Sequence, residues 1–263
     1  MLGAALTPLR ATAMTRFHFL AALAVLCGGA ALWMHHFVFA GAVVLALLAV
    51  MGLGVAIPQL KLFGPFICRG SPAGRRVALT FDDGPDPRST PRLLSILREA
   101  GIHAAFFCIG RRVAANPELA AQIVREGHLL GNHTYSHSYF TNFFTTARLR
   151  AELAQTQAAV EKAAGVTPAY FRPPMGQSNP RTFRAARSLK MQVIGWTVRS
   201  LDTVIANPKK IVARITRRLH PGAVILLHDG NIPVEKLETT VKSLLDTLRA
   251  LGYEVVRLDE LLK

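Results

Sequence analysis

Two long apolar stretches lie in the first quarter of the chain. Residues 17–34 contain a single strongly polar side chain, that of His18, and residues 37–57 contain none. Helices of these lengths rise 1.5 Å per residue and reach about 27 and about 32 Å, close to the roughly 30 Å hydrocarbon core of a bilayer. Only two histidines separate the stretches. We therefore predict a transmembrane helical hairpin over residues 17–57, with both ends on one side of the membrane.

Two other interpretations of these stretches are open. One is a hairpin buried in a soluble domain, but both stretches are apolar on every side and lack the polar stripe of a helix that faces water. The other is a cleaved signal peptide that ends at Ala40. Its apolar run would be unusually long, and a second apolar stretch would remain.

The charges around the hairpin indicate its orientation. The flanking basic residues are Arg10 and Arg16 before it and Lys61, Arg69, Arg75 and Arg76 after it. The turn between the stretches has no Lys or Arg, and loops rich in Lys and Arg stay in the cytoplasm. We expect a two-pass protein of the inner membrane, with residues 1–16 as a cytoplasmic tail and the large domain on the cytoplasmic face.

Residues 58–74 contain three prolines and three glycines among scattered apolar residues, which is typical of a linker. Two interpretations are equally open. Leu60, Leu62, Phe63 and Phe66 lie at the level of the lipid headgroups, or they pack on the domain that follows.

From residue 75 to residue 263, short β-rich apolar runs alternate with helical patterns. We predict strands at residues 77–81, 104–109, 128–132, 169–172, 191–197, 223–227 and 254–256. We predict helices at residues 90–100, 117–126, 145–164, 180–189, 208–219, 234–251 and 259–262. Strict alternation of strands and helices indicates an α/β domain with one parallel sheet, open or closed into a barrel.

Composition limits the function classes. Hydrophobic residues make up 51% of the 263 residues, which excludes a disordered chain, and three widely spaced cysteines exclude a disulfide scaffold. The net charge is +15, and residues 1–76 carry no acidic residue. This charge suits an anionic membrane or a phosphate-bearing substrate. We expect no nucleic-acid binding, because no basic-aromatic platform is present.

Polar motifs follow four of the predicted strands. They are Asp82-Asp83-Gly84-Pro85, Asn132-His133-Thr134-Tyr135-Ser136-His137, Phe171-Arg172-Pro173-Pro174-Met175-Gly176 and Leu226-Leu227-His228-Asp229. Active sites of parallel α/β sheets lie at the carboxyl ends of the strands. We therefore expect these motifs to meet in one site.

The residue types in these motifs indicate a hydrolase. Two imidazoles and a carboxylate, as in His133, His137 and Asp83, can hold a divalent metal that polarises a carbonyl and acidifies water. Asp82 is left to accept a proton, and His228 can protonate an amine leaving group. The set is most naturally suited to hydrolysis of an amide.

The motifs TFDDGP, HTYSH, RPPMG and LLH, in this order, resemble those of the polysaccharide deacetylase family, also called the NodB homology domain or carbohydrate esterase family 4. The resemblance covers residues 75–263. It implies a deformed (β/α)7-type barrel and removal of N-acetyl groups from amino sugars. It also implies a metal, usually zinc with cobalt or manganese as substitutes.

The resemblance implies roles for the motif residues. The metal ligands would be Asp83, His133 and His137, and the catalytic residues Asp82, Arg172, Met175 and His228. Asp82 would be the base and Arg172 would orient it. The backbone N–H of Met175 would stabilise the oxyanion, His228 would be the acid, and Leu226 would line the acetyl pocket.

Two positions depart from the family pattern. The family often has Tyr where this chain has Met175, which alters the pocket wall rather than the mechanism, because only the backbone N–H is needed for the oxyanion. Where the family commonly has an Asp that tunes the acid histidine, this chain has Arg199. A cation beside His228 would depress its pKa. Either Asp202 or Asp229 takes over this task, or Arg199 points elsewhere.

The expected membrane face decides the expected substrate. A cytosol-facing domain would not meet chitin or peptidoglycan, but it would meet sugars carried on polyprenyl phosphate. We therefore expect deacetylation of a lipid-linked N-acylated amino sugar of the envelope. The alternatives are a deformylase acting on a similar carrier, a periplasm-facing deacetylase of a peptidoglycan- or chitin-type polymer, and an inactive carbohydrate-binding module.

Overall fold

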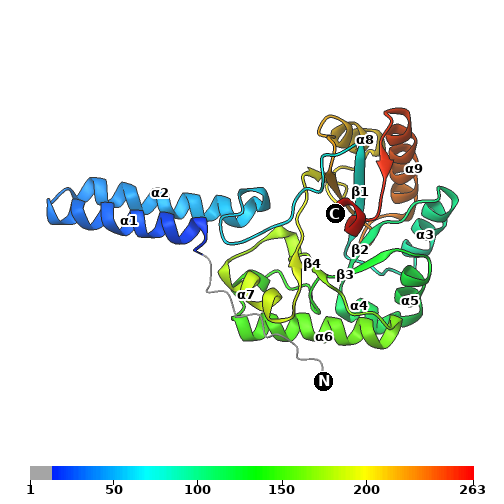
Figure 1. Ribbon diagram of the computed structural model, residues 1–263, viewed down its shortest axis with the longest axis horizontal. Helices are drawn as coiled ribbons and strands as arrows, with labels where there is room; N and C mark the ends of the chain where they lie inside the picture. Colours follow the sequence, from blue (N-terminus) through cyan, green and yellow to red (C-terminus); the bar gives the residue numbers. More distant parts are fainter. Residues whose placement is uncertain (1–13) are drawn as a thin grey trace, which may run out of the picture.

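A computed structural model describes residues 14–263. The expected cytoplasmic tail lies almost entirely outside the described residues. Figure 1 shows a helical hairpin that projects from an α/β domain. Its two helices, α1 (Arg16–Trp33) and α2 (Phe37–Ala56), run side by side in opposite directions. The turn between them lies at the end far from the domain.

Both hairpin helices are long and apolar enough to cross a membrane, and α1 is also placed where a signal sequence would be. Only 6% and 11% of the residues in their apolar windows are buried. This exposure argues against the hairpin as a core element of a soluble domain, because such helices bury their apolar faces.

The domain is built on eight parallel strands. They are β1 (Arg76–Asp82), β2 (Ala105–Cys108), β3 (Leu129–Asn132), β4 (Tyr170–Phe171), β5 (Gln192–Val193), β6 (Val198–Arg199), β7 (Ala223–His228) and β8 (Glu254–Val255). The order across the sheet is β5-β4-β3-β2-β1-β7-β6, and β8 also pairs with β1. The long central strands β1 and β7 place Asp82 directly beside His228.

The sheet is curled, which confirms the expected deformed barrel. Its edge strands β5 and β6 are consecutive in the chain, so only residues 194–197 cross from one edge to the other. Strict β/α alternation is therefore wrong here, and the strand expected over residues 191–197 is broken. After β5 the backbone pairs with Ile67 instead, and Gly195 lies so close to Cys68 that a Cβ there would be 2.6 Å from the Cys68 Sγ.

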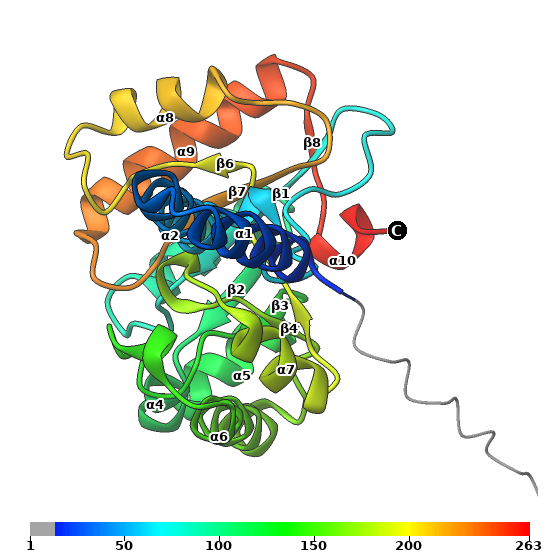
Figure 2. The same ribbon diagram turned by 90° about the vertical axis from the view of Figure 1, so that its left-hand side faces the viewer.

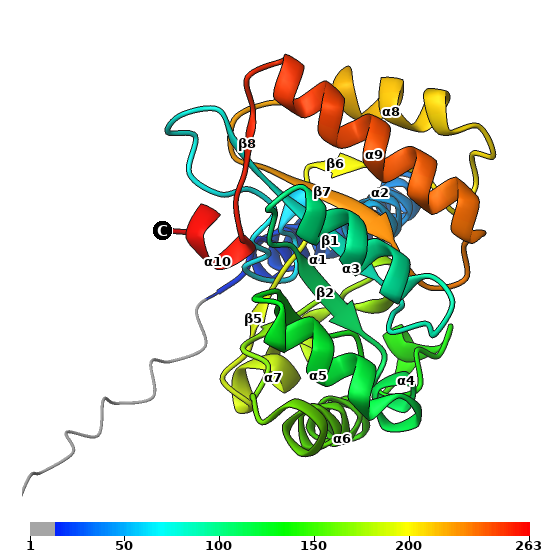
Figure 3. The same cartoon turned by 90° about the vertical axis from the view of Figure 1, so that its right-hand side faces the viewer.

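Helices cover the outer face of the sheet. They are α3 (Thr90–Glu99), α4 (Gly110–Ala115), α5 (Pro117–Arg125), α6 (Thr146–Ala164), α7 (Pro180–Ser188), α8 (Pro208–Thr216) and α9 (Val234–Ala250). The short helix α10 (Leu258–Leu261) lies on the other face, where Leu258 and Leu261 pack with Phe107. In Figure 3, α3, α5 and α9 lie in front of the central strands. Their apolar residues form the main core with alternate residues of β1 such as Leu79 and Phe81. Helix α4 was not expected, since six residues are too few for a periodic pattern.

The segment after the hairpin packs on the domain. Leu62, Phe63 and Phe66 are buried in a core cluster with Phe183 of α7, whereas Leu60 is exposed. These three side chains therefore pack on the domain, as the second of the two interpretations of residues 58–74 predicted. The hairpin and the domain are thus joined by a packed segment.

Candidate active site

The carboxyl end of β1 carries two adjacent aspartates that face different partners. Asp82 is the last residue of the strand and is buried. Asp83 follows in a left-handed conformation, with φ of 73°. Its backbone carbonyl accepts a hydrogen bond of 2.8 Å from Arg112 Nη1. The turn in the backbone directs the Asp83 carboxylate toward the histidines that follow β3.

The loop after β3 presents His133 and His137. The backbone turns sharply at Thr134 and His137, both of which have positive φ. The Asn132 side chain accepts a hydrogen bond from the Thr134 N–H, and its amide donates to the Leu153 carbonyl of α6. These contacts hold the loop that carries both histidines against α6.

The carboxylate of Glu152, on α6, also holds this loop through hydrogen bonds. It accepts hydrogen bonds from the backbone N–H groups of Tyr135 and Ser136, at 3.0 and 2.8 Å, and from the Ser136 hydroxyl at 3.0 Å. Sequence reasoning missed Glu152, because it lies in the middle of a long helix with no motif around it.

Three donor atoms converge on one point. The Asp83 Oδ1 lies 3.2 Å from His137 Nε2 and 3.5 Å from His133 Nε2, and all three donors lie within 4.8 Å of one another. Asp83 Oδ1 is buried and has no hydrogen-bond partner among the described residues. His133 Nδ1 donates to the Arg172 carbonyl at 2.7 Å, which leaves Nε2 unprotonated. Burial lowers the pKa of His133 to about 3, consistent with a neutral imidazole.

Arg172 lies at the centre of the curled sheet and is completely buried. Its Nη1 donates to Asp82 Oδ1 at 2.7 Å and to Thr80 Oγ1 at 2.9 Å, and its Nη2 donates to the Gly195 carbonyl at 3.0 Å. Its guanidinium lies 4.1 Å from the centre of the Phe107 ring. Burial raises the pKa of Asp82 above its ordinary value, although the charge of Arg172 opposes this.

The end of β7 carries His228 in contact with Asp202. His228 Nδ1 donates to Asp202 Oδ1 at 2.8 Å, and the His228 backbone N–H donates to Asp202 Oδ2 at 2.8 Å. Burial alone would lower the pKa of His228, but the hydrogen bond and charge of Asp202 outweigh it and raise the pKa to about 9. His228 is therefore protonated at neutral pH.

This contact shows which residue partners His228 in a chain that has Arg199 where an aspartate was expected. The side chain of Arg199 is exposed, 6.0 Å from the Trp196 ring, and Asp202 takes the place beside His228. Asp229 does not, because its carboxylate accepts a hydrogen bond from Thr90 at 2.6 Å. Of the open alternatives, the geometry selects Asp202 as the partner and places Arg199 elsewhere.

Met175 lies in the loop after β4, in a left-handed conformation with φ of 58°. Such a conformation is costly for a residue with a side chain and is often found at functional sites. Within the described residues its backbone N–H makes no hydrogen bond, so it is available to an acceptor. The next residue, Gly176, is pressed against Trp196 and against Pro58, directly after the hairpin.

The structure thus brings the sequence-predicted residues together. Asp82, Asp83, His133, Arg172 and His228 lie at or just beyond the carboxyl ends of four strands of one sheet. Leu226 is buried in the cluster inside the curl of the sheet. Arg112, which holds the backbone of Asp83, was missed because a surface-helix arginine gives no distinctive signal.

Comparison with known proteins points to one family. Residues 69–194 match the model of the family described as polysaccharide deacetylase. A peptidoglycan-N-acetylglucosamine deacetylase of Bacillus cereus is 36% identical over 189 residues, which covers 71% of this chain and 88% of the relative.

Solved structures agree with the sequence match. A peptidoglycan N-acetylglucosamine deacetylase superposes with a TM-score of 0.69 at 28% identity, covering 74% of this chain and 91% of that one. A carbohydrate esterase family 4 pseudoenzyme from Bacillus anthracis superposes with a TM-score of 0.68 at 31% identity, covering 76% and 69%. From the motifs, the curled sheet and these relatives, we conclude that the chain belongs to the polysaccharide deacetylase family.

Proposed function

We propose that this protein is a metal-dependent hydrolase that removes the N-acetyl group from an amino sugar of a cell-envelope glycan. The observation that carries the proposal is the convergence of the Asp83, His133 and His137 donors beside the Asp82–Arg172 pair. A binding-only protein has no need for a buried base and a protonated histidine around the same point.

The donor set fits a divalent cation. Asp83 Oδ1 is buried and accepts no hydrogen bond from the part of the chain that the structure describes, which is costly unless a cation or donor completes it. Two imidazoles and one carboxylate suit zinc, with cobalt or manganese as substitutes. A metal held by these three residues supplies Lewis acidity to an acyl carbonyl and makes water a better nucleophile at neutral pH.

Asp82 is the base in this proposal. Its Oδ1 is held by Arg172 at 2.7 Å, which fixes the carboxylate and leaves Oδ2 free to accept a proton from the attacking water. The free N–H of Met175 supplies a donor for the oxyanion that forms at the acyl carbon.

His228 is the acid in this proposal. Its protonated ring stands beside Asp82 across the neighbouring strands β1 and β7. Asp202 holds Nδ1–H, so Nε2–H is the proton directed at the departing nitrogen. An amine is a poor leaving group unless it is protonated as the C–N bond breaks, and His228 meets this need.

Two substrate pools fit the site. The basic flanks of the hairpin favour a cytosol-facing domain, and we propose a lipid-linked amino sugar as the substrate there. The second candidate is polymeric glycan on the outer face. It is favoured by relatives named as peptidoglycan deacetylases.

Acetate release tests the proposal. The full-length protein is assayed with a polyprenyl-diphosphate-linked N-acetylglucosamine and with an N-acetylglucosamine oligomer. Asp82→Asn should lower the rate by about 10²- to 10⁴-fold, because it removes the base. Asp246→Asn, a change at an exposed carboxylate, should leave the rate unchanged. Failure to release acetate or formate from any such sugar would refute the hydrolase and favour a binding role.

A further inference from the structure

If the hairpin spans a bilayer, the lengths of its helices fix how deep in the membrane the junction between hairpin and domain lies. Helices α1 and α2 contain 18 and 20 residues and therefore reach about 27 and about 30 Å, close to the thickness of the hydrocarbon core. The hydrocarbon would then end near Thr15 and Ile57, where the helices meet the domain. The domain surface beside these residues would face the lipid headgroups.

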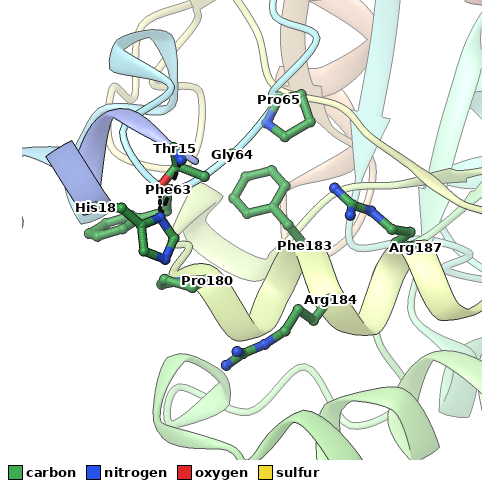
Figure 4. Close-up of a pocket in the computed structure, with 9 residues that line it drawn as sticks. All are labelled: Thr15, His18, Phe63, Gly64, Pro65, Pro180, Phe183, Arg184 and Arg187. Atoms are coloured by element: carbon green, nitrogen blue, oxygen red, sulfur yellow. Dashed lines mark hydrogen bonds between the residues drawn. The ribbon is translucent and has the colours of Figure 1, made fainter. Parts of the chain in front are cut away.

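A pocket lies at this junction (Figure 4). Its lining comes from the start of α1, the segment after the hairpin and α7, and comprises Thr15, His18, Phe63, Gly64, Pro65, Pro180, Phe183, Arg184 and Arg187. A second pocket continues from it along Pro65, Phe183 and Arg187 to Lys190. Together they form one groove, which we call the junction groove. Figure 2, which looks along the hairpin toward the domain, shows α7 beside the hairpin base.

The junction groove has an apolar floor and a basic rim. Phe63 and Phe183 are buried. Arg184, Arg187 and Lys190 are exposed, and in residues 14–263 none of them makes an ion pair. Arg184 and Arg187 lie three residues apart on α7, and both line the groove, one on each side of Phe183 (Figure 4).

The lining of the groove contains no acidic residue to neutralise this rim. Both chain segments that form the groove belong to acid-free stretches, residues 1–76 and residues 162–201. The second stretch carries seven basic residues, of which only Arg172 is taken up by an internal carboxylate. An anionic ligand would therefore meet exposed cations and no competing carboxylate in the lining of the groove.

The apolar floor and the membrane depth specify the kind of anion. A soluble anion would use the guanidinium groups but would gain nothing from the phenylalanine and proline surface. We propose that the junction groove binds the headgroup of an anionic phospholipid, with the phosphate between Arg184 and Arg187 and the glycerol region over Phe183 and Pro65. This contact would fix the tilt of the domain on the membrane. The inference concerns membrane attachment and goes beyond the proposed hydrolysis.

Lipid binding by the full-length protein tests this site. The protein in detergent is titrated with phosphatidylglycerol or phosphatidylcholine, and bound lipid is counted by native mass spectrometry. Phosphatidylglycerol should bind more tightly. The double variant R184Q/R187Q should lose about 30-fold in that affinity, because each basic residue near a lipid surface contributes roughly fivefold. The charge-matched variant K209Q/K210Q, on exposed residues of α8, should bind as the wild type does.

Amide hydrogen exchange shows whether the lipid binds at the junction groove or elsewhere on the protein. Phosphatidylglycerol should slow amide exchange in α7 in the wild type and in K209Q/K210Q, but not in R184Q/R187Q. The proposal is overturned if both lipids bind equally, if the two double variants lose affinity alike, or if millimolar inorganic phosphate displaces the lipid. None of these outcomes depends on acetate release, so they are separate from the test of hydrolysis.

Discussion

The contact between Asp202 and His228 gives the histidine a carboxylate partner that the local motif does not supply. Arg199 stands where the family resemblance led us to expect the partner of the acid histidine, yet the structure places a carboxylate 2.8 Å from His228 Nδ1. Asp202 reaches this place because Leu201 adopts a left-handed conformation, with φ of 59°, that turns the chain back. A leucine with positive φ is uncommon, so sequence reasoning could narrow the partner to two aspartates but could not choose between them.

This contact predicts a change in pH dependence. In the proposed mechanism the protonated form of His228 is the active one, so activity should fall as pH rises through its pKa of about 9. In Asp202→Asn the charge that raises this pKa is gone, and the alkaline limb of kcat/KM should move down toward the ordinary histidine value near 6.5. The pH profile of acetate release measures the shift. An alkaline limb that stays near 9 in Asp202→Asn, as it should in Asp246→Asn, would show that Asp202 does not tune His228.

At the scale of elements, long and strongly patterned segments were predictable and short ones were not. Strand β1 and helices α6 and α9 follow from their apolar periodicity, and the motifs at strand ends placed the site at the correct edge of the sheet. Strands β5 and β6 have two residues each, and the chain between them pairs with Ile67 and passes close to Cys68. Such a tertiary contact leaves no periodic signal.

The support of the histidine loop by α6 predicts an effect on metal affinity. In Glu152→Gln the negative charge that strengthens the hydrogen bonds from the N–H groups of Tyr135 and Ser136 is lost, and an NH2 group replaces one of the two acceptor oxygens. The loop with His133 and His137 should loosen, and metal affinity should fall by about 10- to 100-fold. Competition with a chromogenic chelator measures the affinity.

A matched control lies on the same helix. Glu161 is an exposed residue of α6, and Glu161→Gln should keep the metal affinity of the wild type. If Glu152→Gln also keeps it, the hydrogen bonds from the loop do not position the ligands.

At the scale of the whole molecule, the +15 charge and the 51% hydrophobic content belong to different parts of the chain. The exposed hairpin accounts for two long apolar stretches that do not enlarge the core of the domain. The acid-free segments meet at its base, in the junction groove. We therefore regard the hairpin and the groove as one membrane-attachment unit and the curled sheet as the catalytic unit.

The face of the membrane that carries the catalytic unit decides between the two substrate pools. A reporter fused after Lys263 measures it, using one enzyme that is active only in the cytoplasm and one that is active only outside it. The basic residues beside the hairpin predict cytoplasmic activity. Activity outside the cytoplasm would rule out the lipid-linked pool as proposed and leave the polymeric glycan.

The central claim is that Asp83, His133 and His137 hold a metal that this hydrolase needs. The most direct test measures acetate release from an N-acetylglucosamine oligomer or its lipid-linked form by the full-length protein, before and after removal of metal with a chelator. The account predicts that chelation abolishes acetate release and that zinc, cobalt or manganese restores it. The variant Asp83→Asn should release no acetate at the metal concentration that restores the wild type. Release that survives complete removal of metal, or that Asp83→Asn leaves intact, would contradict the account.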